Sequence, residues 1–204
     1  LVLIEETFSL MNMFTSRVNG KTLEEQMKNI FRIACAFSHS FYCPYNVPIG
    51  MNLSGTPLNE AIVSLHQILP RFKSENKLQK VQCIILTDGE AAPMRYSREI
   101  QRHWEHVPFM GSSYISDGCV IRNRKTGHTY SCQGLGYWAD VTDLLLKDLR
   151  DSFPDMNFIG IRVLNGRDAG QFIRRYTGYQ GDAYTMMMRR WKRERTFSIK
   201  NSGY

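Results

Sequence analysis

The sequence lacks any long hydrophobic run. Its most continuous apolar stretch, Cys83-Ile84-Ile85-Leu86, has the length of a buried strand. A membrane-spanning helix needs about 20 consecutive apolar residues, so the sequence gives no reason to expect one. Internal repeats and low-complexity segments are missing too, and the 43% hydrophobic and 22% charged residues are typical of one ordinary globular domain over residues 1–204.

Cysteine is scarce and irregularly spaced. An odd number, five, argues against the disulfide framework of a secreted protein and predicts a reducing compartment, so we expect a cytoplasmic location. A glycine-rich phosphate loop, a nucleophile elbow and a catalytic triad are also missing from the sequence. These absences favour a binding protein over a self-sufficient enzyme.

Positive charge is concentrated in one segment. The net charge is +7, and the tail 186–204 carries six basic side chains against Glu194 alone. Its Met186-Met187-Met188 run and Trp191 predict a terminal helix that packs an apolar face on the domain. The alternative is a nucleic-acid contact made by the arginines and lysines of this tail.

Apolar periodicity predicts an alternation of helices and strands. The expected helices are 1–18, 22–38, 57–73, 141–151 and 168–176; the expected strands are 80–87 and 158–164, both covered on two faces, with a hairpin at 120–131. In the helix 141–151, Leu145 and Leu149 should face the core and Asp148 the solvent. The order strand, helix, strand, helix predicts an α/β fold, a Rossmann-like parallel sheet flanked by helices, with residues 94–137 as an insertion that carries the hairpin.

Two polar residues stand where an open parallel sheet binds its ligands. Asp88 directly follows the strand 80–87, and Thr56 is the expected N-cap of the next helix upstream, with Pro57 at its first position. Hydroxyl and carboxylate oxygens suit a hard divalent cation. The sequence therefore predicts a Mg²⁺ or Mn²⁺ site containing Thr56 and Asp88. The residues next to it are Ser54, Gly55, Gly89 and Glu90.

These residues belong to two motifs that resemble those of a known family. Leu53-Ser54-Gly55-Thr56-Pro57-Leu58-Asn59-Glu60-Ala61-Ile62 resembles the threonine motif of von Willebrand factor A (VWA) domains, and Ile84-Ile85-Leu86-Thr87-Asp88-Gly89-Glu90 resembles their aspartate motif. The sequence looks most similar to VWA proteins of tailed bacteriophages that are labelled after the VWA subunit of cobalt chelatase. The resemblance is strong over residues 50–90 and weaker over 155–204.

The resemblance implies a metal-ion-dependent adhesion site (MIDAS), which the family builds from three loops. Thr56 and Asp88 would belong to the second and third loops. The Asp-x-Ser-x-Ser motif of the first loop does not occur in this sequence, so we expect a C-terminal fragment that lacks the N-terminal strand and the first metal loop. The implied function is a non-catalytic protein-binding module whose partner is an AAA+ ATPase of the chelatase or MoxR type, in the cytoplasm of a phage host.

A second constellation consists of cysteines and histidines in the region 94–137. Cys119 and Cys132 lie at equal distances along the chain from the centre of the expected hairpin, so they should face each other across it. With His103 or His106 they would form a zinc site, and a zinc enzyme is the third functional interpretation. The spacing fits no standard zinc motif, however, and we expect the protein to contain little or no zinc.

Overall fold

The computed structural model divides the chain into two units. The residues that the structure describes are 2–3, 8–38, 43–47, 51, 55–104, 106–134, 141–177 and 181–198. Unit 1 comprises Leu1–Val81 and Glu90–Asn157, and unit 2 comprises Gln82–Gly89 and Phe158–Tyr204. Within the described residues, no helix has both the length and the apolar character that a membrane span requires.

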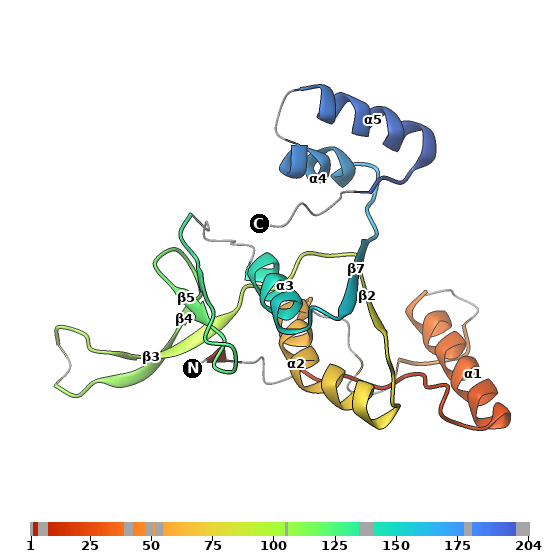
Figure 1. Ribbon diagram of the computed structural model, residues 1–204, viewed down its shortest axis with the longest axis horizontal. Helices are drawn as coiled ribbons and strands as arrows, with labels where there is room; N and C mark the ends of the chain where they lie inside the picture. The colour runs from red at the N-terminus through yellow and green to blue at the C-terminus, as the bar shows by residue number, and fades with distance from the viewer. Residues whose placement is uncertain are drawn as a thin grey trace. The chain divides into compact units, whose positions relative to one another are not determined.

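Two packed helices, α2 (Leu58–Glu75) and α3 (Val141–Ser152), form the core of unit 1 (Figure 1). Both helices were predicted, because their apolar residues recur at helical spacing. Ile62 of α2 and Leu149 of α3 are almost completely buried between them and the neighbouring segments. The expected Thr56 cap is wrong, since α2 begins at Leu58 and its N-cap position is Pro57, which offers no side-chain hydrogen bond.

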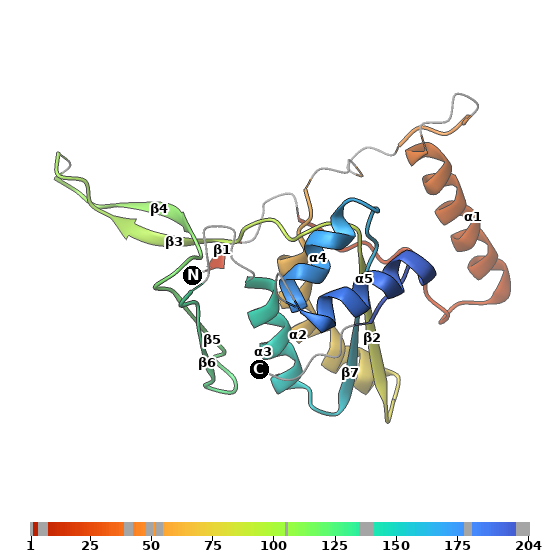
Figure 2. The same ribbon diagram turned by 90° about the horizontal axis from the view of Figure 1, so that it is seen from above.

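The described residues of the region 94–137 form two β-hairpins, of which the sequence predicted one. β5 (Val120–Arg122) and β6 (Thr129–Ser131) confirm the predicted hairpin and its register. β3 (Arg95–Ile100) and β4 (Phe109–Tyr114) form the other, and β1 (Val2–Leu3) pairs antiparallel with β3 (Figure 2). The strands β3 and β4 escaped prediction because their sequences do not alternate between apolar and polar residues.

Among the described residues of the N-terminal part of unit 1 there is one helix where two were expected. α1 (Gly20–Phe37) confirms the second, and it begins after Asn19, whose side-chain oxygen accepts a 2.9 Å hydrogen bond from the backbone of Thr22. The first expected helix, 1–18, is wrong, because Val2–Leu3 forms β1 and residues 8–19 contain no helix. Strand pairing with distant β3 overrides the local apolar pattern here.

The described part of unit 2 consists of two helices and two parallel strands, whose first one or two residues belong to unit 1. β2 (Val81–Thr87) and β7 (Met156–Arg162) form a two-stranded sheet, followed by α4 (Asp168–Thr177) and α5 (Asp182–Glu194), which pack against each other. The Val163 N–H donates to the Thr87 carbonyl at 2.8 Å, so the carboxyl ends of the two strands coincide, as in a parallel pair. The predicted strands and α4 are confirmed.

One face of the β2–β7 sheet is exposed and apolar, although both strands were expected to be covered. Leu86 is 67% exposed and Ile161 46%. The members of this face alternate along both strands and are Ile84, Leu86, Ile159 and Ile161. The fold is therefore mixed α/β with small sheets, including one parallel pair, and the largest sheet among the described residues is the three-stranded sheet β1–β3–β4.

Candidate functional site

The Thr56 loop is fixed by hydrogen bonds to one backbone segment. Gly55 has φ 78°, a left-handed conformation that glycine adopts without strain, and it turns the chain into Thr56. The Thr56 carbonyl accepts a 2.9 Å hydrogen bond from the Ala92 N–H, and the Asn59 amide donates to the Ala92 carbonyl at 3.2 Å. Asn59 also accepts from the Thr142 hydroxyl at 2.7 Å. The start of α2 is thereby joined to residue 92 and to α3.

Asn59 was missed as a site residue, although its position contained a usable signal. It stands three residues before Ile62 and ten before Leu69, on the stripe of α2 that faces the core. A polar side chain on such a stripe must find partners inside the protein. Asn59 is 2% exposed and finds them in Ala92 and Thr142.

Glu60 is the most unusual acidic residue near Thr56. It lies in the first turn of α2, one helical turn after Thr56, and is 4% exposed. Its Oε2 atom has no hydrogen-bond partner among the described residues. A buried carboxylate oxygen without a partner is costly, so this atom is chemically suited to a cation.

Asp88 lies where the carboxyl ends of β2 and β7 meet. The turn that follows β2 is held by Thr87, whose hydroxyl donates to the Gly89 carbonyl at 3.0 Å and accepts from the Gly89 N–H at 3.2 Å. This turn leaves Asp88 exposed at the end of the strand pair. Its carboxylate is therefore accessible to a ligand at the edge where parallel sheets bind them.

The predicted metal residues are divided between the two units. Gly55, Thr56 and Glu90 belong to unit 1, whereas Asp88 and Gly89 belong to unit 2. Ser54 lies outside the described residues. Within unit 1, the orphaned carboxylate oxygen of Glu60 is a donor of the kind that a hard cation such as Mg²⁺ prefers.

The cysteine and histidine constellation separates into two places. Cys119 and Cys132 are opposite each other, as predicted, because the β5–β6 register that pairs Val120 with Ser131 continues by one residue and Cys132 N–H donates to the Cys119 carbonyl at 3.0 Å. His103 and His106 are exposed in the loop between β3 and β4. Among the described residues, no three His, Cys, Asp or Glu side chains are grouped as a metal would require.

A buried polar cluster joins the β5–β6 hairpin to α2 and α3. The Asp148 carboxylate accepts from the Asn123 amide at 2.7 Å and lies 3.2 Å from Nε2 of His66. The same Asn123 nitrogen lies 3.1 Å from the Ser152 hydroxyl, and the Tyr130 hydroxyl donates to Asp151 at 2.8 Å. The expectation that Asp148 faces solvent is therefore wrong, because distant partners compensate for its burial.

Burial controls the ionisation of this cluster. It lowers the pKa of His66, and the nearby charge of Lys125 acts in the same direction, while the Asp148 carboxylate opposes both. Burial, with the hydrogen bond to Asp151, raises the pKa of the Tyr130 phenol. The cluster is therefore held with neutral His66 and Tyr130, which suits a structural connection.

α5 has a packed face and a basic face. Trp191 is half-buried, and its ring packs edge-on against the ring of Phe197 with 5.9 Å between the centroids. Phe197 in turn contacts Phe172 of α4, also at 5.9 Å between centroids. Met186, expected on the packed face, is exposed. The basic face exposes Arg189, Arg190 and Arg193.

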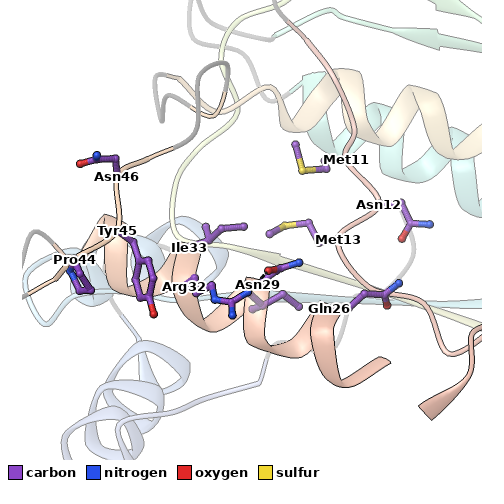
Figure 3. A pocket seen from close by; sticks show the side chains of 11 residues that line it. Met11, Asn12, Met13, Gln26, Asn29, Arg32, Ile33, Pro44, Tyr45 and Asn46 are labelled. Atoms are coloured by element: carbon purple, nitrogen blue, oxygen red, sulfur yellow. Dashed lines mark hydrogen bonds between the residues drawn. The ribbon is translucent and has the colours of Figure 1, made fainter. Parts of the chain in front are cut away.

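A pocket of about 600 Å³ lies between α1 and two flanking segments, 11–13 and 44–46 (Figure 3). Figure 3 shows Met13, Ile33 and Tyr45 among its lining side chains. The described residues that line it supply amides and Arg32, and none of them is a carboxylate, a histidine or a cysteine.

Comparisons with family models, curated proteins and solved structures found no significant match for this chain.

Proposed function

We propose that this chain supplies two of the three loops of a VWA-type, metal-dependent protein-binding module with a Rossmann-like sheet. In this proposal Thr56 and Asp88 bind Mg²⁺ or Mn²⁺, and a segment outside these 204 residues supplies the Asp-x-Ser-x-Ser loop. The metal would keep one position open for a carboxylate of a partner protein. The partner we propose is an AAA+ ATPase of the chelatase or MoxR type in a phage-infected cell.

The observation that carries the proposal is the place of Asp88, directly after the shared carboxyl end of a parallel strand pair. Open parallel sheets bind ligands at this edge. The Thr56 loop is also hydrogen-bonded to Ala92, which follows Asp88 by four residues in the sequence. The buried Glu60 oxygen without a partner adds a reason to expect a cation near Thr56.

The exposed apolar face of the β2–β7 sheet is also consistent with the proposal. Parallel sheets are almost always covered on both faces, so a two-stranded sheet with exposed Ile84 and Leu86 is an incomplete structure by this criterion. A VWA-type sheet has further strands and helices that would cover these residues. Under the proposal they come from the same outside segment that supplies the first metal loop.

Metal titration tests the proposal. We would measure Mn²⁺ binding by calorimetry on the longest natural form of the protein and on its Asp88→Ala variant. Removing a ligand should weaken binding by at least roughly tenfold, whereas Asp182→Ala, which removes an exposed carboxylate at the start of α5, should not change it. Equal affinity of Asp88→Ala and the unchanged protein would show that the site assignment is wrong.

A second candidate function rests on the exposed arginines of α5. Arg189, Arg190 and Arg193 lie within about one helical turn of each other and are exposed. Such a row could contact nucleic-acid phosphates, whose binding depends strongly on salt. Glu194, which pairs with Arg190 at 2.8 Å and with Arg193 at 2.5 Å, reduces the positive charge of this row.

A further inference from the structure

Cys119 and Cys132 lie directly opposite each other at the base of the β5–β6 hairpin. The Asn123 N–H donates to the His128 carbonyl at 2.9 Å, and the Cys132 N–H donates to the Cys119 carbonyl at 3.0 Å, so both are hydrogen-bonded pairs of one antiparallel ladder. Residues opposite each other in such pairs have Cα atoms about 5.5 Å apart. A disulfide spans about 4.4–6.8 Å between Cα atoms, so the separation of this pair lies within the range that a disulfide can bridge.

The base of the hairpin is held in place beside the two cysteines. The Asp117 carboxylate accepts from the Gly118 N–H at 3.1 Å and from the Gly134 N–H at 3.2 Å, so one side chain connects the segments before β5 and after β6. The Cys119 N–H also donates to the Ser116 carbonyl at 3.1 Å. These bonds keep the two cysteine backbones at their ladder separation.

The two thiols differ in access. Cys132 is completely buried, whereas Cys119 is half-exposed. Burial raises the pKa of the Cys132 thiol, and the neighbouring Cys119 raises it further. An oxidant in solution therefore meets Cys119 first, and Cys132 is placed to react only with the sulfur of Cys119.

We propose that Cys119 and Cys132 form a reversible disulfide by exchange with a low-molecular-weight disulfide of the glutathione type. The Cys119 thiolate attacks one sulfur of oxidised glutathione and forms a mixed disulfide, and one glutathione leaves as a thiolate that takes up a proton. Cys132 then loses its proton and attacks the Cys119 sulfur, which releases the second glutathione. Two protein thiols are oxidised, and one glutathione disulfide is reduced to two thiols.

The disulfide would fix the hairpin base from which Asn123 and Tyr130 reach α3. None of the other cysteines in the described residues faces a cysteine across a pair of strands: Cys35 lies on α1, Cys43 in a loop, and Cys83 on β2, whose neighbouring strand β7 contains no cysteine. Oxidation should therefore select the hairpin pair.

Peptide mapping of the 204-residue chain tests the proposal. The protein is equilibrated with glutathione buffers of increasing oxidised fraction, its free thiols are alkylated, and it is digested with trypsin. Trypsin cleaves after Arg122, Arg124 and Lys125, so the two cysteines fall on different peptides that only a disulfide keeps together. The expected result is one linked peptide pair, Cys119 with Cys132, while Cys83 is alkylated.

Two variants complete the test. In Cys132→Ala the mixed glutathione disulfide should accumulate on Cys119 roughly tenfold above its level in the unchanged protein, because the intramolecular second step is lost. In Cys119→Ala, Cys132 should stay alkylatable only after unfolding. This second variant replaces a half-exposed side chain, so it provides the readout if Cys132→Ala does not fold. A glutathione adduct on Cys119 without the linked pair, or a link between two chains, would overturn the proposal.

Discussion

The Asn123 amide donates a 2.7 Å hydrogen bond to the carboxylate of Asp148, and this bond connects the turn of the β5–β6 hairpin to the buried side of α3. Asn123 also holds its own turn, because its side-chain oxygen accepts from the backbones of Lys125 and Thr126. One side chain thus stabilises both the local turn and a long-range contact.

Replacing Asn123 should therefore destabilise the protein. A hydrogen bond to a charged group contributes about 1.5–3 kcal/mol, so Asn123→Ala should lower the free energy of unfolding by about 2 kcal/mol in urea titrations. Asn123→Asp keeps the acceptor oxygen for the turn but removes the donor and puts a second carboxylate beside Asp148. It should also destabilise, whereas Arg124→Ala, an exposed neighbour in the same turn, should not. An unaffected Asn123→Asp would contradict the role of the amide.

The protein should become less stable as the pH falls, because His66 is then protonated. Burial lowers its folded pKa below the ordinary value of 6.5, despite the Asp148 carboxylate 3.2 Å away. Protonation therefore favours the unfolded chain: the contribution of neutral His66 is complete above pH 6.5 and is lost as the pH falls toward the folded pKa. The urea midpoint should be measured for the protein and for His66→Gln between about pH 7.5 and about pH 5. It should fall more steeply with decreasing pH in the unchanged protein, since the variant lacks this titration. Parallel pH profiles would contradict the prediction.

The orphaned carboxylate oxygen of Glu60 gives opposite predictions for stability and for metal binding. In metal-free buffer, Glu60→Met should raise the free energy of unfolding by about 1 kcal/mol, because it removes a buried polar atom without a partner and keeps a side chain of similar length. Added Mg²⁺ should raise the melting temperature of the unchanged protein, and it should raise that of the variant by a smaller amount. Destabilisation by Glu60→Met without metal would show that the carboxylate has a favourable structural role.

The sequence predicted most helices and one hairpin because their signals are local. The opposition of Cys119 and Cys132 followed from the expected centre of the β5–β6 hairpin, and α2 and α3 followed from apolar periodicity. What it missed depends on contacts between distant segments. β1 pairs with β3, which lies far from it in the sequence, and the burial of Asp148 depends on His66 and Asn123.

The candidate site shows the same limit. Asp88 could be placed at a strand end from the run that precedes it, and the structure has it there. The hydrogen bonds of Ala92 to Thr56 and Asn59 could not be predicted, because nothing in the sequence near Ala92 marks it as a partner. The exposure of Ile84 and Leu86 also escaped prediction, since a continuous apolar run indicates that a strand should be covered but not what covers it.

Substitutions in α5 separate its packing from nucleic-acid binding. Trp191 contacts Phe197, and Phe197 contacts Phe172, so Trp191→Ala should lower the free energy of unfolding by about 2 kcal/mol, less than a fully buried tryptophan because its side chain is only half-buried. Arg190 and Arg193 are exposed and pair with Glu194, and exposed ion pairs contribute little to stability, so their joint replacement by Gln should leave stability nearly unchanged. Filter binding with single- and double-stranded DNA and RNA across a salt series then measures nucleic-acid binding by α5. We expect weak binding that the Gln replacements hardly change, because Glu194 already offsets part of the charge and the aromatic contacts fix α5 against α4. Tight, steeply salt-dependent binding that the two replacements abolish would favour the nucleic-acid function over the protein-binding module, since each neutralised phosphate releases counterions.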